Sequence, residues 1–372
     1  MATPADAGVN NVVETRKRNS VGDLECVGTA LEVECILPET PSDGAVNVSE
    51  ANAELDETEA SFTSQVADTL LLISPFFFWG TSMAVMKVVA PHTSPLFVGA
   101  VRLLPAGVVL VLWAAMSGRP QPKSVMAWTA VALFGLIDGA CFQGCLAEGL
   151  QRTSAGLGSV IIDSQPITVA LLANFFFDEA LSSTIVAGMG LGILGLGLLE
   201  IPPQLLAGGP QALTEFISTS GGGLQMGSIW DSGEWWMLLA AQSMAVGTVM
   251  VRWVAKYCDP VSATGWHMVL GSLPLIALCV TRESDILIPR LAEFNGMDAL
   301  SLLYITLLGS AASYGVFFYN ASKGNLTSLS SLTFLTPVFA TITGYVVLGE
   351  SLTSLQLGGA AITLLGVFCI NK

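Results

Sequence analysis

The sequence predicts an all-α integral membrane protein with ten transmembrane helices, arranged as two inverted repeats of five helices. The first observation is composition: the 372 residues are 52% hydrophobic and only 12% charged, whereas soluble domains carry about a quarter charged residues. The second is a series of ten apolar runs along the chain. The third is a match between the two halves of the sequence. Together these features place most of the chain in a lipid bilayer.

The ten apolar runs are the predicted transmembrane spans. A helical crossing takes about 20 consecutive, mainly apolar residues, and a helix satisfies its own backbone hydrogen bonds in lipid. The predicted spans are 69–89, 95–116, 127–147, 155–177, 184–201, 235–254, 261–281, 299–319, 326–348 and 355–370.

The longest break between spans, residues 202–234, divides the ten spans into two groups of five. It contains Pro202-Pro203 and Gly221-Gly222-Gly223, a composition that is typical of a flexible linker. The first repeat is therefore predicted to cover residues 65–201 and the second repeat residues 235–372.

An acidic tail, residues 1–64, precedes the first repeat. It holds 13 acidic and 3 basic residues, a net charge of −10 out of −15 for the whole chain. The tail lacks an apolar period and cannot bury enough surface to offset chain entropy, so it is predicted to be disordered. Its composition fits neither a secretory signal nor a normal transit peptide. No nucleic-acid partner is expected.

The two halves match when the sequence is slid by 171 positions, without a gap from Arg152 to Gly195. Earlier in each half the offset drifts, yet Arg102 and His267 each stand seven residues after a proline. This is an internal repeat. The matched residues include Pro166 with Pro337, Glu179 with Glu350, Gly188 with Gly359 and Gly195 with Gly366.

Five spans per repeat place the second copy in the opposite orientation across the membrane, and inverted repeats suggest alternating access. With the N-terminus in the cytoplasm or the plastid stroma, basic residues are slightly more frequent inside than outside, as the positive-inside rule expects. The inside group is Arg119, Lys123, Lys256, Lys323 and Lys372, and the outside group is Arg152, Arg282 and Arg290.

Ionisable side chains within the spans are candidate site residues, because each costs about 2.5–3.5 kcal/mol on insertion scales. Arg102 lies in the second span and is predicted either to bind an anionic substrate group or to pair with Asp138, Glu148 or Asp163. Asp163, in the fourth span before Pro166, either contacts a substrate amine, carries a proton or pairs with Arg102.

The second repeat offers hydroxyl groups and a histidine at the matching places. His267 occupies the position of Arg102 and is either a group that changes charge near neutral pH or a neutral, hydrogen-bonded histidine. Thr333 and Thr336 precede Pro337 as Gln165 precedes Pro166. The predicted substrate-binding residues are therefore Arg102, Asp163, Gln165, His267, Thr333 and Thr336, with Asp163 and His267 as the residues that would couple transport to protons.

Other polar residues have weaker functional signals. Asp138 and Glu148 lie ten residues apart on the third span and point to similar faces, so they either form a relay or Glu148 extends to the membrane edge. Gln143 and Tyr314 are expected to add neutral hydrogen bonds. The matched pair Glu179 and Glu350 is expected to cap a helix or hold a loop.

Several motifs are set aside. Gly190-x-Gly192-x-x-Gly195 has the spelling of a dinucleotide fingerprint but lies in an apolar helix with no preceding strand. Gly188 and Gly192, with Gly358 and Gly359 in the tenth span, are better explained by close helix packing. The sequence contains no nucleophile motif and no metal-ligand cluster. We therefore expect no enzyme activity, no metal and no cofactor.

Three stretches resemble a known family: SPFFFWGT (74–81), GLQRTSAGLGS (149–159) and SSLTFLTP (330–337). Over about residues 69–371 the chain resembles EamA-type members of the drug/metabolite transporter superfamily, and these stretches are similar to plastid-assigned plant proteins of the "walls are thin"-related group. The resemblance implies two five-helix EamA repeats around a central cavity, with the fifth and tenth spans at the periphery, where they can support a homodimer. It also implies a plastid membrane, with the plasma membrane as the alternative.

The predicted function is secondary transport of a small metabolite by alternating access. A phosphorylated substrate would require clustered basic residues, and only Arg102 lies deep in a span, so an amino-acid-like, zwitterionic or amphipathic metabolite is favoured. A non-transporting receptor or scaffold and a carrier of phosphorylated metabolites are the alternatives. The expected partners are the lipid bilayer and this small-molecule substrate.

Overall fold

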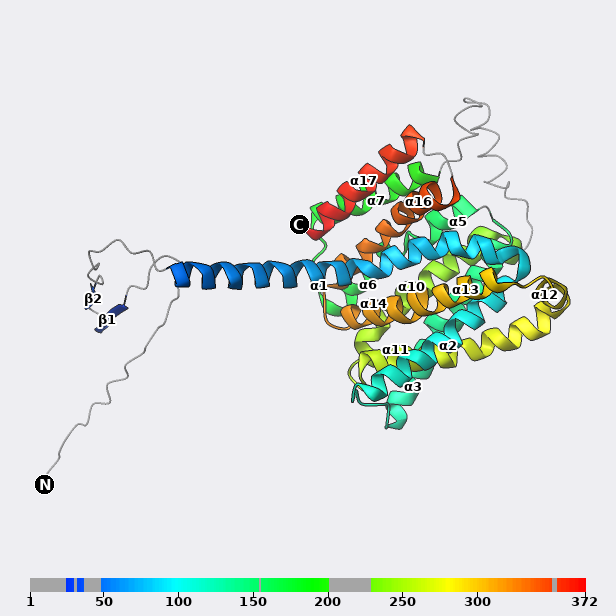
Figure 1. Ribbon diagram of the computed structural model, residues 1–372, viewed down its shortest axis with the longest axis horizontal. Coiled ribbons are helices and arrows are strands. Elements are labelled where there is room, and N and C mark those ends of the chain that lie inside the picture. The colour runs from blue at the N-terminus through cyan, green and yellow to red at the C-terminus, as the bar shows by residue number, and fades with distance from the viewer. Residues whose placement is uncertain (1–24, 30–31, 37–47, 154, 201–228, 350–352) are drawn as a thin grey trace, which may run out of the picture. The chain divides into compact units, whose positions relative to one another are not determined.

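The computed structural model describes residues 25–29, 32–36, 48–153, 155–200, 229–349 and 353–372. The chain divides into an N-terminal unit, Met1–Thr63, and a helical bundle, Ser64–Lys372, each of which is described by itself. The bundle (Figure 1) confirms the predicted all-α membrane fold.

The described part of the N-terminal unit differs from the predicted disordered tail. Strands β1 (Glu25–Thr29) and β2 (Glu32–Ile36) pair antiparallel, and Glu32 to Cys35 alternate polar and apolar residues as a strand does. Helix α1 (Val48–Val89) begins inside the tail, where a segment rich in Ala and Glu favours helix. The other tail residues, and residues 201–228 of the linker, lie outside the described residues.

The first repeat contains the five predicted spans. The first is the C-terminal part of α1 with the short helix η1 (Ala90–His92), and the second is α2 (Pro95–Met116). The third joins α3 (Val125–Phe134), a π-helical segment η2 (Gly135–Cys141) and α4 (Phe142–Leu150). The fourth joins α5 (Ala155–Ile162) and α6 (Gln165–Phe177), and the fifth is α7 (Ser183–Glu200).

The second repeat begins after η3 (Ile229–Asp231) with α10 (Gly233–Val254). The seventh span joins α11 (Pro260–Leu278), the π-helical η4 (Cys279–Glu283) and α12 (Ser284–Leu291). It passes the predicted end at residue 281: the helix continues through the polar segment 282–285 into a second apolar stretch, Ile286, Leu287 and Ile288. The last three spans are α13 (Gly296–Thr306), η5 (Leu307–Ala312) and α14 (Ser313–Ala321); α15 (Leu326–Ser331), η6 (Leu332–Phe334) and α16 (Leu335–Leu348); and α17 (Ser354–Asn371).

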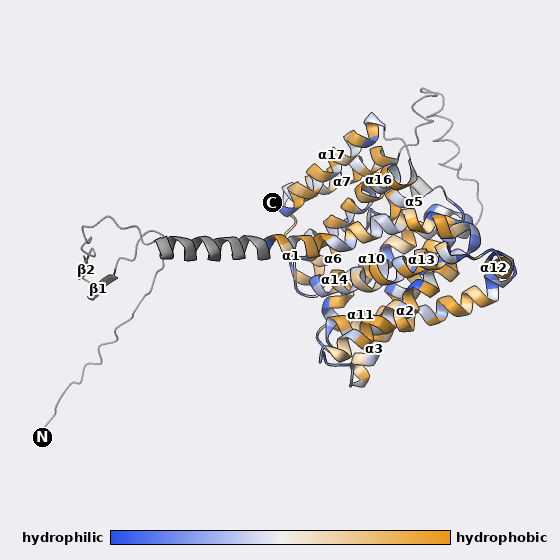
Figure 2. Ribbon diagram, viewed as in Figure 1, coloured by the Kyte–Doolittle hydropathy of each residue, from blue (hydrophilic) through white to orange (hydrophobic). Residues whose placement is uncertain are grey.

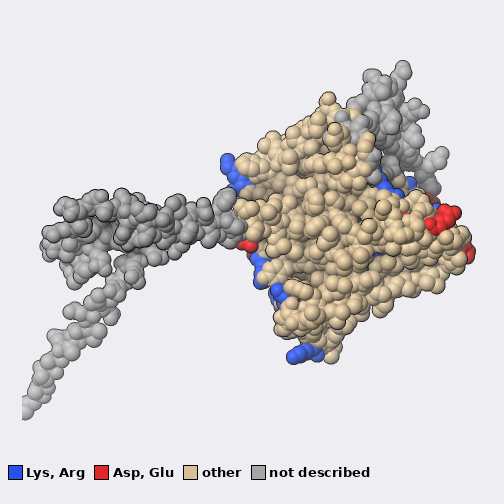
Figure 3. Space-filling view, viewed as in Figure 1, with Lys and Arg blue, Asp and Glu red and all other residues tan. Residues whose placement is uncertain are grey.

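The surface of the bundle fits a lipid environment. Among the described residues, nine helical segments have the length and apolarity for a membrane crossing, and Ser183–Leu199 in α7 is a shorter apolar helix. Figure 3 shows charged side chains gathered toward two ends of the bundle, with a broad band between them that carries almost none. Large apolar side chains face outward, such as Leu194 (55% exposed) and Phe368 (61%), and apolar residues dominate the helices in Figure 2. Such a surface is stable in lipid rather than in water.

The helices are interrupted at matching places in the two repeats. The third and eighth spans each contain a π-helical segment, η2 and η5, a feature that is frequent at functional sites. The α-helix of the fourth span is interrupted at Asp163-Ser164, and that of the ninth span is interrupted by the 3₁₀ turn η6. Each interruption directly precedes a helix that has a proline near its start. A proline cannot donate a backbone hydrogen bond, so these breaks follow from Pro166 and Pro337.

The fifth and tenth spans pack against each other at one edge of the bundle (Figure 1). A Cβ atom at Gly195 would lie 2.7 Å from the carbonyl oxygen of Gly359, and one at Gly188 would lie 2.8 Å from that of Gly366. These glycines therefore serve a contact within one chain, where close helix approach needs small residues. The homodimer through these two spans stays a prediction. Gly190, Gly197 and Gly358 are the glycines of these spans that have open space where a Cβ atom would lie.

Glu179 ties the first repeat to the second. Its carboxylate accepts hydrogen bonds from the amides of Leu326 (3.0 Å) and Thr327 (3.1 Å) and from the Thr327 hydroxyl (2.9 Å). It also pairs with Arg252 at 2.8 Å. Glu179 therefore caps the N-terminus of α15, as the predicted structural role requires. Its counterpart Glu350 lies outside the described residues.

Replacing Glu179 by alanine is expected to lower the free energy of unfolding by about 1–2 kcal/mol, because two amides at a helix N-terminus lose their acceptor. Burial raises the pKa of Glu179, but the Leu326 and Thr327 amides, the Thr327 hydroxyl and Arg252 outweigh it and hold the pKa below its usual value of 4.5. A lowered pKa gives stability that is present above the unfolded-state pKa and is lost as the pH falls through the native pKa.

Thermal melts of the detergent-solubilised protein test this prediction. The melting temperatures of wild type and Glu179→Ala should differ at neutral pH, begin to converge below pH 4.5 and meet once the pH has fallen through the lowered native pKa. The exposed Asp285 provides the control, because Asp285→Ala should melt as wild type does. A difference between wild type and Glu179→Ala that does not change with pH would contradict the role of the ionised carboxylate.

Candidate functional site

Two buried polar pairs cross between the repeats at the middle of the bundle. In one pair, His267 Nε2 on α11 lies 3.2 Å from Asp138 Oδ2 in η2. In the other pair, Arg102 Nε on α2 donates to Ser310 Oγ in η5 at 3.1 Å. The inverted repeat relates the second span to the seventh and the third to the eighth, so these pairs are counterparts of each other. All four residues are buried.

Gln143 and Tyr314 lie between the two pairs. The Gln143 amide donates to the Tyr314 hydroxyl at 3.4 Å, and Tyr314 interacts electrostatically with both Arg102 and Asp138. These two residues are separated by 171 positions, the offset of the repeat. A residue and its counterpart can contact each other only near the axis that relates the repeats, so this cluster lies on that axis.

The contacts of His267 define its protons. Its Nδ1 lies 2.5 Å from the Thr264 carbonyl oxygen, which can only accept, so Nδ1 carries a hydrogen. Nε2 is therefore the nitrogen that faces Asp138. The imidazole stacks on Phe134 with ring centroids 4.1 Å apart and meets the Phe318 ring edge-on. These aromatic contacts hold the ring in one orientation.

The two charged side chains of the axis cluster are incompletely satisfied. No described carboxylate forms an ion pair with Arg102; besides Ser310, its neighbours are the Tyr314 hydroxyl and the Met86 sulfur, which lies 3.9 Å from Nη1. Asp138 Oδ1 is buried and has no hydrogen-bond partner among the described residues. The site can therefore offer a positive group to an anion and a carboxylate oxygen to a donor.

A second group of buried, unpartnered atoms lies beside the helix breaks of the fourth and ninth spans. Both polar atoms of the Gln165 side chain and the Thr336 hydroxyl have no partner among the described residues. Gln165 and Thr336 are again 171 positions apart. An unsatisfied buried polar group costs about 1–3 kcal/mol, so matched unpaired groups of this kind indicate a place for a ligand or water.

The other predicted site residues make local hydrogen bonds. Asp163 Oδ2 accepts from Ser159 Oγ at 3.1 Å, one helical turn earlier. Thr333 Oγ1 donates to the Ser330 carbonyl at 2.7 Å. Both residues are buried. The structure thus places them on the same spans as Gln165 and Thr336, while their role in binding stays a prediction.

Helix α1 connects the two groups. The Trp79 ring lies 5.3 Å from that of Tyr314, and its buried indole nitrogen has no described partner. The next residue, Gly80, packs against the Thr336 backbone, where a Cβ atom would lie 2.6 Å from the carbonyl oxygen. Trp79 is half-buried and packs against the core of the bundle.

Contacts between the repeats also tie both ends of the bundle. At the end that carries Lys123, Gln121 hydrogen-bonds to Ser262 Oγ (3.2 Å) and to the Trp266 indole (2.9 Å), and Arg119 pairs with Asp259 (3.0 Å). A hollow of about 470 Å³ lies beside these residues. It is about 10 Å along α11 from His267, so it is not the buried polar site.

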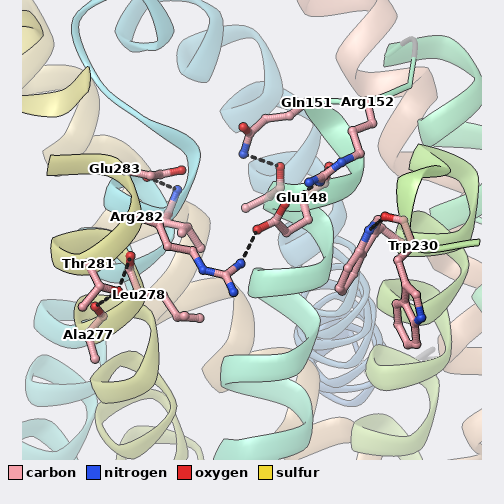
Figure 4. Close-up of polar contacts among 12 residues, drawn as sticks. Glu148, Gln151, Arg152, Trp230, Ala277, Leu278, Thr281, Arg282 and Glu283 are labelled. Carbon is pink, nitrogen blue, oxygen red and sulfur yellow. Dashed lines mark hydrogen bonds and ion pairs between the residues drawn. The ribbon is translucent and has the colours of Figure 1, made fainter. Parts of the chain in front are cut away.

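At the opposite end, Glu148 on α4 lies between two arginines (Figure 4). It pairs with Arg152 on its own span and with Arg282 of η4 at 3.2 Å. These contacts lie near the end of the span that closes at Leu150, which favours the membrane-edge position for Glu148 over the relay with Asp138. Asp138 instead pairs with His267. No sequence pattern predicted this contact or the contact of Arg102 with Ser310.

Comparison with known proteins supports a transporter. Residues 68–201 and 231–372 match the EamA-like transporter family. A chloroplastic WAT1-related protein of Arabidopsis thaliana is 56% identical over 81% of this chain and 68% of its own length. An uncharacterized transporter of Synechocystis is 47% identical over 85% of this chain and 93% of its own.

More distant relatives extend this similarity. A probable amino-acid metabolite efflux pump of Salmonella typhimurium is 26% identical over 81% of this chain and 93% of its own length. One solved crystal structure, at 15% identity, superposes with a TM-score of 0.63 over 82% of this chain and 98% of that chain. That likeness concerns the fold alone.

Proposed function

Because this chain belongs to the EamA-like transporter family, we propose that it carries a small, amino-acid-like zwitterion across a plastid membrane by alternating access. It is a multi-pass membrane protein whose relatives are named as transporters. The chloroplastic relative at 56% identity supports the plastid assignment, and the relative named as an amino-acid metabolite efflux pump supports the substrate class.

The observation that carries this proposal is the opposite charge of two incompletely paired groups on the repeat axis. Arg102 has no described carboxylate partner, and Asp138 Oδ1 has no described hydrogen-bond donor. Tyr314 interacts electrostatically with both residues, which supports a shared site. A substrate carboxylate would bind Arg102 and its ammonium group would bind Asp138 Oδ1, because each then gains a charge-assisted hydrogen bond.

The remaining predicted residues would contact the rest of the substrate. Gln165 and Thr336 offer unpartnered polar atoms, and Trp79 offers an aromatic face beside them. Asp163 and Thr333 lie on the same spans. The repeat contacts at the two ends, Gln121 with Ser262 and Glu148 with Arg282, would break and re-form in turn as the site opens to each side.

Uptake by proteoliposomes tests this function. Vesicles preloaded with unlabelled amino acids should take up the labelled amino acid by counterflow, at a saturable rate that protein-free vesicles lack. Counterflow of sugar phosphates but not of any amino acid would replace the proposal with the phosphorylated-metabolite alternative. Thermal stabilisation by a ligand that is never transported would indicate a receptor.

A further inference from the structure

The pair formed by Asp138 and His267 has room for one proton beyond the one on Nδ1. Nδ1 holds its hydrogen against the Thr264 carbonyl, so Nε2 faces Asp138 Oδ2 either with a lone pair or with a second proton. At 3.2 Å, a stable contact requires one proton between these two atoms. The pair is then neutral overall, whether that proton is on the imidazole or on the carboxyl group.

Loss of this proton would leave an unfavourable arrangement. The Nε2 lone pair would face a carboxylate, and the pair would carry a net charge of −1 at residues that are only 1% (His267) and 2% (Asp138) exposed. A buried, uncompensated charge is costly. The deprotonated pair therefore needs another cation, and Asp138 Oδ1, which has no described partner, is the atom that can receive it.

The surroundings of the pair leave few other groups to supply that cation. Helix α3 carries no titratable side chain, and the aromatic rings of Phe134 and Phe318 enclose the imidazole. Across Tyr314 lies Arg102, whose fixed charge is available to a substrate carboxylate. The titratable groups on the elements that pack against the pair are Arg102 on α2, Cys141 in η2, Cys145 and Glu148 on α4, Glu234 and Arg252 on α10, Cys279, Arg282 and Glu283 in η4, and Tyr314 and Tyr319 on α14.

We propose that Asp138 and His267 bind the transported proton and exchange it for the substrate ammonium group, so that the protein is a proton/zwitterion antiporter. This inference rests on the proposed function. On one side of the membrane the ammonium group binds Asp138 and the shared proton leaves to water. On the other side a proton from water returns to the pair and the ammonium group is released.

Exchange follows from competition for a single carboxylate. The proton on Oδ2 or Nε2 and the ammonium group on Oδ1 each neutralise the same negative charge, and binding both would leave a buried positive charge on the pair. The carrier therefore crosses with one or the other. This order predicts that substrate accumulates in the more acidic compartment.

The experiment is accumulation of a labelled amino acid in proteoliposomes with a pH gradient and the membrane potential clamped at zero. Exchange of one proton for one substrate gives about tenfold accumulation in an acidic lumen for each pH unit. His267→Gln removes the protonatable nitrogen but keeps a hydrogen-bonding side chain, and its accumulation ratio is expected to fall to about one. The accumulation ratio at equilibrium is set by the pH gradient and the exchange stoichiometry, so it does not depend on how much protein inserts.

The chain supplies a matched control in its other histidine. His92 Nδ1 lies 2.9 Å from Asp298 Oδ2, but the His92 side chain is 26% exposed, and the pair joins the ends of two spans. His92→Gln should accumulate substrate as wild type does. A wild-type ratio of one, accumulation on the alkaline side, or an equal loss in both glutamine variants would overturn the antiport proposal while the proposed transport function stands.

A second measurement decides the matter if no amino acid is transported. In the His92→Gln background His267 is the only histidine, so ¹⁵N NMR of labelled protein reports its two ring nitrogens directly. Across a broad pH range, Nδ1 should stay protonated while Nε2 is found both with and without a proton. An imidazole spectrum that does not change over this range would overturn the proton site.

Discussion

Arg102→Ala is expected to reduce amino-acid uptake by about thirtyfold or more while the protein still folds. The structure gives Arg102 a hydroxyl partner, Ser310, and no described carboxylate partner, so its charge is available to the substrate. Loss of a charge-assisted hydrogen bond costs about 2 kcal/mol, which corresponds to roughly thirtyfold in binding. Removing an unpaired buried charge should not destabilise the bundle, because no described carboxylate is left behind.

Initial rates of uptake at low substrate concentration measure this effect. Arg152→Ala is the matched control, because Arg152 pairs with Glu148 at the end of the third span, away from the axis cluster. Arg102→Lys should retain part of the activity, since it keeps the charge without the planar donor geometry. Wild-type uptake by Arg102→Ala would exclude Arg102 from the substrate site.

Gly247→Ala is expected to abolish accumulation driven by a pH gradient, although the substitution adds a single methyl group. A Cβ atom at this position of α10 would clash first with Asp138 Oδ1, and it would lie 2.6 Å from Asp138 Cβ and 2.7 Å from Cγ. Asp138 would have to move away from the 3.2 Å contact with His267. Overpacking of this kind also costs about 1–3 kcal/mol of stability.

Gly190→Ala is the control for Gly247→Ala. Gly190 also lies within a transmembrane helix, α7, but has no atom within 4 Å of the position of an added Cβ. In the accumulation assay used for His267→Gln, the ratio should fall to about one for Gly247→Ala and stay at the wild-type value for Gly190→Ala. Full accumulation by Gly247→Ala would show that the position of Asp138 is not critical.

The sequence predicts the helices, their breaks and the inverted repeat well, because each of these features is determined by residues that are close together in the chain. Helix α2 begins and ends where its apolar run does, at Pro95 and Met116. The breaks in the fourth and ninth spans follow from Pro166 and Pro337, whose effect on a helix does not depend on neighbours. The inverted plan follows from counting spans in each repeat.

The sequence predicts the site less completely, because the partner of a buried residue depends on how helices rotate against each other. Asp138 and His267 are 129 positions apart, and no local pattern indicates that they meet. The π-helical segments η2 and η5 change the direction of side chains within the third and eighth spans, and nothing in the apolar runs predicted them. The repeat does match Arg102 with His267 in the sequence. It also matches Asp138 with Ser310, if the offset of 171 positions is changed by one.

The central claim is that one zwitterion bridges Arg102 and Asp138, and a comparison of substrate analogues tests it most directly. Dissociation constants are measured for the transported amino acid, its methyl ester and its deaminated acid, with wild type, Arg102→Ala and Asp138→Asn. We predict that Arg102→Ala weakens binding of the amino acid by about thirtyfold or more but leaves binding of the ester unchanged. Asp138→Asn is expected to weaken binding of the amino acid and to leave binding of the deaminated acid unchanged. Equal weakening of all three ligands by either substitution would contradict the claim.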